Sequence, residues 1–225
     1  MTKLVDIFLQ PSKVFAAERE RPTYLLPWMV LVAFTVAFTL AYFLRVDPGW
    51  YADHMFDASG AQMTAKEAAQ ARAMMPGARS MALFGTAGTV VSLAIMFAIT
   101  GLYFWLASKL TGRGLTYRHG LSLATWGAMP AALGAIIALV GALTMSPQTG
   151  MESLMLTHVD PLIVQLPNDA RWNKLAQNAD LLSLWTIFLG ALGWRTFTRS
   201  GWGQAILVSV LPLAIIYGVM ALIAR

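Results

Sequence analysis

The stretch ALFGTAGTVVSLAIMFAITGLYFWLAS, residues 82–108, contains no Asp, Glu, Lys, Arg or His. A helix needs about 20 apolar residues to cross the ~30 Å of hydrocarbon in a bilayer, and this run is long enough. The whole chain of 225 residues suits the same environment, because it is 57% hydrophobic and only 12% charged. An average soluble domain is about a quarter charged. The sequence therefore predicts an integral membrane protein.

Four further apolar runs predict more membrane-spanning helices. Together with the first run they give five spans, at about residues 24–44, 82–108, 121–145, 177–194 and 205–224. The fourth span is the weakest, because its strictly apolar part is short and it must borrow residues upstream or lie in a thinned bilayer. We expect an all-α integral membrane protein with five transmembrane helices, forming a single domain over residues 1–225.

The distribution of Lys and Arg predicts the orientation of the chain. Nine of these residues lie in short segments on the side of the N-terminus: Lys3, Lys13, Arg19, Arg21, Lys109, Arg113, Arg118, Arg195 and Arg199. The other seven lie on the opposite side, most of them in longer loops. Since short cytoplasmic loops carry the excess of positive charge, we expect a cytoplasmic N-terminus and a C-terminus outside. Residues 45–81 and 146–176 are then outer loops.

The connections between the spans carry local signals of their own. Residues 4–22, LVDIFLQPSKVFAAERERP, mix apolar and charged residues at helical spacing, which predicts that residues 1–23 form an amphipathic segment on the cytoplasmic interface. This segment lacks the apolar core and cleavage site of a signal peptide, so we expect the first span to remain uncleaved. In the first outer loop, Thr64 stands three residues before Glu67, a capping box that opens a surface helix.

The stretch KLTGRGLTYRHG, residues 109–120, is a short basic hairpin between the second and third spans. Its glycines let the chain reverse, and it lacks the spacing of a nucleotide-binding P-loop. Two interpretations of its charges, Lys109, Arg113 and Arg118, stay open. They anchor the hairpin at anionic headgroups, or they dock an acidic partner or a lipid phosphate. Arg195 and Arg199, in the last cytoplasmic connection, belong to the same basic face.

Small residues and prolines predict how the helices pack. Gly127, Gly134 and Gly141 recur every seven residues in the third span and so share one stripe, along which a neighbouring backbone can approach closely. Pro130 removes a helical hydrogen bond in the same span and predicts a kink. Pro212 predicts the same for the fifth span.

The residues that carry most enzyme chemistry are scarce. The chain has no Cys and three His, and none of the histidines has a histidine partner at helical spacing. We therefore expect no catalytic site, no cofactor and no metal, although five outer-loop residues leave a metal site open as an alternative: Asp53, His54, Asp57, His158 and Asp160. The span interiors hold no ionisable side chain, which ion-coupled carriers usually need. We expect Asp180, at the outer end of the fourth span, to lie at the interface.

Three segments carry a resemblance to a known family. They are IFLQPSKVF (7–15), YFWLASKLTGRGLTYRHGLSLATWGAMP (103–130) and LLSLWTIFLGALGWRTFTRSGWGQAILVSVLPLAII (181–216). The sequence resembles the Yip membrane family, the Ypt/Rab-interacting proteins and their bacterial relatives. The resemblance implies five spans, a cytoplasmic N-terminus and no known catalytic site. The long cytoplasmic region of eukaryotic members is missing, which points to the bacterial branch and to a bacterial inner membrane.

Two functions fit these features. The first is a non-enzymatic scaffold or adaptor that organises partners or lipids through its basic cytoplasmic face. The second is a passive permease or lipid-translocating protein that opens a polar path beside the proline-kinked third and fifth helices. The expected partners are membrane lipids, a protein docked at the basic face and a second copy of the chain, but no nucleic acid.

Overall fold

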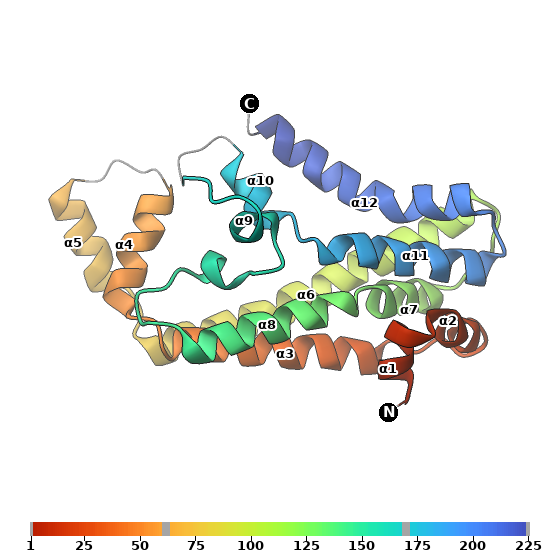
Figure 1. The fold of residues 1–225 in the computed structure, drawn as a ribbon, viewed down its shortest axis with the longest axis horizontal. Helices are drawn as coiled ribbons and strands as arrows, with labels where there is room; N and C mark the ends of the chain where they lie inside the picture. The colour runs from red at the N-terminus through yellow and green to blue at the C-terminus, as the bar shows by residue number, and fades with distance from the viewer. Residues whose placement is uncertain (1, 60–63, 168–171, 224–225) are drawn as a thin grey trace.

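The computed structural model describes residues 2–59, 64–167 and 172–223. Regular structure in these residues is helical, as the sequence predicts (Figure 1). The elements are α1 (Thr2–Leu9), α2 (Pro11–Glu20), α3 (Leu25–Phe43), α4 (Pro48–Ser59), α5 (Ala65–Met74), α6 (Ala78–Leu110), α7 (Tyr117–Gly127), α8 (Pro130–Thr144), the 3-10 turn η1 (Met151–Leu154), α9 (Val159–Leu162), α10 (Asn173–Asn178), α11 (Leu182–Thr198) and α12 (Trp202–Ile223).

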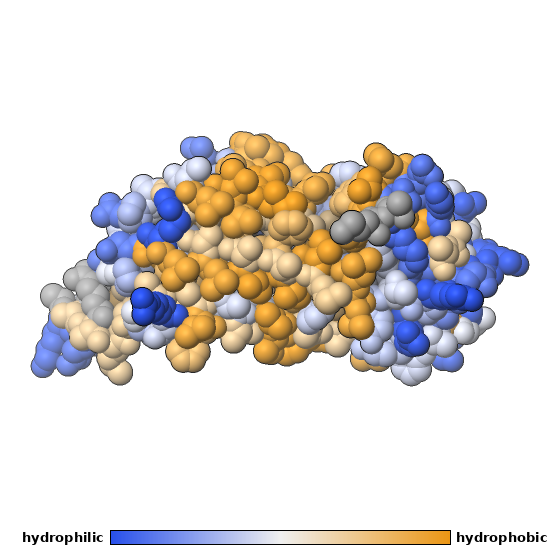
Figure 2. All heavy atoms as spheres, turned by 90° about the horizontal axis from the view of Figure 1, so that it is seen from below, coloured by the Kyte–Doolittle hydropathy of each residue, from blue (hydrophilic) through white to orange (hydrophobic). Residues whose placement is uncertain are grey.

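The long helices lie along one axis of the molecule and are apolar where they face outward. Helices α3, α6 and α12 are long and apolar enough to cross a membrane, and α7 with α8 passes the same test as one bent span. On the face that Figure 2 shows, hydrophobic residues cover the middle of the molecule, while hydrophilic residues gather at its two ends. The described chain thus has three or four candidate spans. Helix α11 has only 17 residues, so the fifth crossing stays a prediction.

The predicted third span consists of two helices that meet near Pro130, the proline that predicts its kink. Helices α7 and α8 meet at an angle of 43°, and Pro130 is the first residue of α8. A proline is tolerated there because the first helical N–H has no partner within its own helix. Pro212, by contrast, lies inside α12, which continues through it as one helix.

The N-terminal segment differs from the interfacial helix that its sequence predicts. It forms two helices that separate at Gln10, and α2 packs against α7 and α11 at one end of the bundle (Figure 1). Ile7, Val14 and Phe15 are completely or almost completely buried in this contact. This part of the apolar surface is covered by protein, whereas Val5 and Leu9 of α1 are exposed, and the place of the segment at the membrane interface stays a prediction.

The rest of the chain contains one predicted feature and one unexpected one. The capping box is present: the Glu67 carboxylate accepts from the backbone N–H of Thr64, whose hydroxyl accepts from the backbone N–H of Glu67. The Thr64 backbone N–H and hydroxyl both donate to the Glu67 carboxylate, and these two bonds lower the pKa of the Glu67 carboxyl. The fourth apolar run differs from its prediction, because its helix begins only at Leu182, after the separate short helix α10.

The bundle has a basic end and an opposite end, and cysteine labelling tests which side each faces. The chain has no natural cysteine, so single cysteines give no background. Ser200 is buried, so we choose the exposed positions Ser12 and Gly201 at the basic end and Gln70 in α5 at the other end. An impermeant thiol reagent added to intact cells should label Gln70→Cys. It should label Ser12→Cys and Gly201→Cys only after permeabilisation. External labelling of Gly201→Cys would contradict the orientation deduced from charge.

Candidate functional site

Three short basic segments of the sequence meet at one end of the bundle. They are the N-terminal helices α1 and α2, the hairpin between α6 and α7, and the hairpin between α11 and α12 (Figure 1). The Arg113 guanidinium donates a hydrogen bond of 3.2 Å to the side-chain oxygen of Gln204, which joins the two hairpins. The five cations that the sequence indicates as contact residues are all exposed here: Lys109, Arg113, Arg118, Arg195 and Arg199.

The five cations differ in how the protein holds them. The Lys109 ammonium lies 5.9 Å from the centre of the Trp105 ring, and the Arg195 guanidinium lies 5.0 Å from that of Trp202. Both pairs suit a membrane interface, where aromatic rings and long cations gather. Arg113 stands at the hairpin tip between Gly112 and Gly114, which have φ angles of 67° and 66° and so make the reversal possible. Within the described residues, Arg118 has no hydrogen-bond or ion-pair partner.

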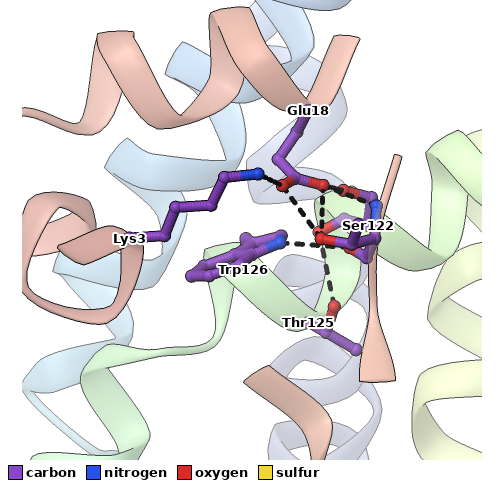
Figure 3. Close-up of polar contacts among 6 residues, drawn as sticks. Lys3, Glu18, Ser122, Thr125 and Trp126 are labelled. Atoms are coloured by element: carbon purple, nitrogen blue, oxygen red, sulfur yellow. Dashed lines mark hydrogen bonds and ion pairs between the residues drawn. The ribbon is translucent and has the colours of Figure 1, made fainter. Parts of the chain in front are cut away.

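A buried carboxylate, Glu18 of α2, connects the N-terminal helices to the start of α3 and to α7 (Figure 3). Its side chain is fully buried and accepts from the Lys3 ammonium at 2.8 Å and from the Ser122 hydroxyl of α7 at 3.1 Å. It also accepts from both the backbone N–H and the hydroxyl of Thr23, where the chain enters α3. One side chain thus ties α1, α2, α3 and α7 together. We call Lys3, Glu18, Thr23, Ser122 and Trp126 the Glu18 junction.

Other residues at the basic end of the bundle complete the hydrogen bonding around the Glu18 junction. The Trp126 indole, which is fully buried, donates to the Thr23 carbonyl at 3.0 Å. His119 caps α7 through the Thr116 hydroxyl, and its Nε2 lies 3.1 Å from the Arg19 carbonyl. A buried charge destabilises a fold unless it is paired and hydrogen-bonded, and these contacts meet that condition. The junction is therefore a rigid support for the exposed cations.

Glu18 was not among the residues that the sequence indicated, although a signal for it exists. Val14, Phe15 and Glu18 are spaced as one helix face, and the first two are apolar. A carboxylate that continues an apolar stripe is a candidate for burial. What no local pattern could supply is its partner Ser122, which lies 104 residues away. Ser122 and His119 therefore serve structural bonds: the serine hydroxyl donates to Glu18 and the histidine caps a helix.

The predicted glycine stripe meets several different neighbours. Gly127 faces Gly190 of α11, whose Cα would lie 3.7 Å from a Cβ added to Gly127, so two backbones come close there. Gly134 faces Thr157 and Leu182, and Gly141 faces Leu154. The stripe thus lies against α11 at one end and against the 146–181 connection further along. Its role in packing stays a prediction.

A second polar group lies beside the middle of the bundle. His158 and Asp180 line a hollow of about 180 Å³ together with Thr35 of α3 and Gly134 of α8. The His158 Nε2 is 4.0 Å from an Asp180 oxygen, and the imidazole Nδ1 contacts the Gln177 carbonyl. Thr35 is near the centre of α3, so the hollow adjoins the middle of that helix, while the position of Asp180 at the membrane interface stays a prediction. The connection between α8 and α11 has folded inward.

The five residues considered for a metal site do not gather into one cluster in the described part of the chain. They are Asp53, His54, Asp57, His158 and Asp160. His54 is paired with Glu152 at 2.8 Å and stacks on Trp50, whereas Asp160 is buried and accepts from the backbone N–H of Leu166. Burial, together with the nearby Glu152 charge, raises the pKa of the Tyr51 phenol. The pair of His54 and Glu152 holds α4 to the 146–181 connection.

Comparisons with known proteins match nearly the whole chain to one family of membrane proteins. A sequence model of the Yip1 domain matches residues 5–223. Membrane protein YknW of Bacillus subtilis (strain 168) is 22% identical over 209 residues, which cover 91% of this chain and 84% of that protein. No solved structure matches the chain significantly.

Proposed function

This chain belongs to the Yip1 domain family of membrane proteins, and on that premise we propose that it is a non-enzymatic scaffold, with its basic end in the cytoplasm of a bacterial inner membrane. The observation that supports this role is the gathering of three separate basic segments at one end of the bundle, where the Glu18 junction joins α1 and α2 to α7. A surface made from three segments and fixed by buried hydrogen bonds presents its charges in a constant arrangement. It needs no cofactor for this role.

The exposed cations suit an anionic partner. Each Lys or Arg near an anionic surface contributes about 1 kcal/mol, so five of them attract such a surface strongly but without choosing among anions. Arg113 can add selectivity, because its planar guanidinium binds carboxylate or phosphate in a bidentate manner that lysine cannot reproduce. Its position at the tip of the hairpin makes it accessible. We propose an acidic protein surface as its partner, with a second copy of the chain as another candidate.

Replacing Arg113 by Lys tests this recognition. If Arg113 docks a partner, Arg113→Lys should reduce co-purification of that partner about five- to tenfold, because the bidentate contact is worth roughly 1 kcal/mol or more. Insertion and melting temperature should not change. The measurement is quantitative mass spectrometry of proteins retained by each variant at two salt concentrations, since exposed charge contacts are screened.

Two variants serve as controls for that experiment. Gln204→Ala removes the hydrogen bond between the hairpins and leaves the guanidinium in place, so it should retain the partner. Neutralising Lys109, which stacks on Trp105, should affect anchoring more than recognition. Equal retention by wild type and Arg113→Ala would end the recognition hypothesis and leave charges that serve only orientation.

A passive permease or lipid-translocating protein is the second candidate, and the hollow with His158 and Asp180 favours it. Ionisable groups beside the middle of a span mark polar pathways in many membrane proteins. The hollow adjoins α8 just after the 43° bend. Liposomes that contain the protein should then show faster solute flux or lipid scrambling than empty ones, and Asp180→Asn should reduce that rate. No flux above the empty liposomes would reject this candidate.

A further inference from the structure

A groove opens sideways from the bundle at its basic end, between α3, α6 and α7. It consists of two adjoining hollows of about 240 and 340 Å³, which share Tyr24 and Leu25. Trp28, Phe97 and Leu121 line the first hollow. Leu25, which both hollows share, and Met29 of the second hollow are 57% and 52% exposed. Volumes of this order accommodate small-molecule ligands. The groove is apolar along its length and is continuous with the belt that faces lipid.

The groove ends at polar groups. Tyr24 lines both hollows, Arg118 lines the second, and Tyr117 lines the first. Tyr117 donates a hydrogen bond to the Ala98 carbonyl at 3.1 Å, which holds the start of α7 against α6. Tyrosine and arginine are residues that gather at the headgroup level of a bilayer. Arg118 is exposed and has no partner within the described residues, so its guanidinium is available to an anion.

We propose that this groove binds one anionic phospholipid, with an acyl chain in the two hollows and the phosphate at Arg118. The occupant follows from the position of the groove, because an apolar hollow that opens toward lipid is filled from the bilayer. The charge of Arg118 selects among the lipids available there, since a guanidinium binds a phosphate group in a bidentate manner. Basic pockets between membrane helices bind anionic headgroups in the same way.

The Glu18 junction fixes the shape of this site. Glu18 accepts from Thr23, the residue before Tyr24, and from Ser122, which lies in α7 one turn from Arg118. Trp126 holds the Thr23 carbonyl as well (Figure 3). The two sides of the groove, α3 and α7, are thus joined by hydrogen bonds that are buried at Ser122 and partly buried at Thr23. The site goes beyond the scaffold role and does not rest on it, because it uses a different face and a different arginine.

The test measures lipid retained by the purified protein. The protein is reconstituted in vesicles of equal phosphatidylglycerol and phosphatidylcholine, extracted in mild detergent and measured by native mass spectrometry. Wild type should retain phosphatidylglycerol in preference. Arg118→Gln should reduce that preference about fivefold, the effect of one charge near an anionic headgroup. Ala94→Phe places a ring in the first hollow and should reduce retention of both lipids.

Two matched variants decide the outcome. Arg113→Gln removes the same charge from the same hairpin but outside the groove, and Ala87→Phe adds the same ring to an exposed position of α6 away from it. Both should retain phosphatidylglycerol as wild type does. Equal losses in Arg118→Gln and Arg113→Gln would show diffuse attraction and overturn the proposal. So would wild-type retention by Ala94→Phe.

Discussion

Glu18→Ala should detach α1 and α2 from the bundle and lower the free energy of unfolding by about 3–5 kcal/mol. Hydrogen bonds to a charged group contribute about 1.5–3 kcal/mol each, and the substitution removes those from Ser122 and from the Thr23 N–H. The substitution leaves the buried Ser122 hydroxyl without its acceptor, and the Thr23 N–H, whose bond to Glu18 is partly buried, loses its acceptor as well. Each orphaned polar group adds to the loss. Lys3, which is partly exposed, can turn to solvent and adds least.

Glu20→Ala is the matched control, because Glu20 belongs to the same helix and is exposed. It should melt within about 0.5 kcal/mol of wild type, as most surface substitutions do. Thermal unfolding in detergent measures the stability, and limited trypsin digestion at Lys13, Arg19 and Arg21 measures whether α2 has detached. If Glu18→Ala resists trypsin and melts like Glu20→Ala, the junction does not hold the N-terminal helices to the bundle.

The helices that a membrane requires could be predicted from composition, whereas the short ones could not. Helices α3, α6 and α12 follow runs of apolar residues in which no alternative structure satisfies the backbone in lipid. The bend before Pro130 follows from the missing N–H. These features depend on neighbours in the sequence. They are therefore visible without the structure.

The region around the fourth run depends instead on distant contacts. The backbone N–H of Leu181 bonds to the Thr157 carbonyl, and that of Val159 bonds to the Ala179 carbonyl. These bonds stop the helix from extending backwards into residues 177–181, where the apolar pattern alone placed its start. Hydropathy reports how a segment partitions between water and lipid. It does not report which loop occupies the space beside it.

The same limit applies to the basic end. Charge counting predicted that Lys109, Arg113, Arg118, Arg195 and Arg199 belong to one side, and the structure brings them to one end. Their support by Glu18 was not predicted, because a carboxylate in a charged segment is expected to be solvated until its partners on other helices are known. Exposed charges follow from the topology. Buried ones require the tertiary contacts.

A close helix contact involves glycines outside the predicted stripe. The seven-residue spacing of Gly127, Gly134 and Gly141 shows which residues share a face, but not which face meets another backbone. The seam between α6 and α7 is formed by Gly101 and Gly120. A Cβ on Gly120 would overlap the Gly101 carbonyl oxygen and lie 3.3 Å from the Trp105 backbone nitrogen. Both obstacles are main-chain atoms, which cannot turn aside as a side chain can.

Gly120→Ala should therefore destabilise the protein by about 3 kcal/mol, the upper part of the range for overpacking in a tight core. One methyl group would force α7 away from α6, and with it Tyr117, Ser122 and the rest of the Glu18 junction. We expect a lower melting temperature in detergent and faster trypsin cleavage of α2. The second effect follows because α2 is held partly by α7.

Gly88→Ala in α6 makes the same change where a Cβ would meet nothing within 4 Å. Alanine is favoured over glycine in a helix by roughly 1 kcal/mol, so this variant should melt at or above the wild-type temperature. The same methyl group should then act with opposite signs in two adjacent helices. A general sensitivity of the chain to added volume would lower both melting temperatures, whereas a close seam lowers only that of Gly120→Ala. If Gly120→Ala melts with wild type, α6 and α7 are separated by more than the structure shows, and the groove beside them is wider.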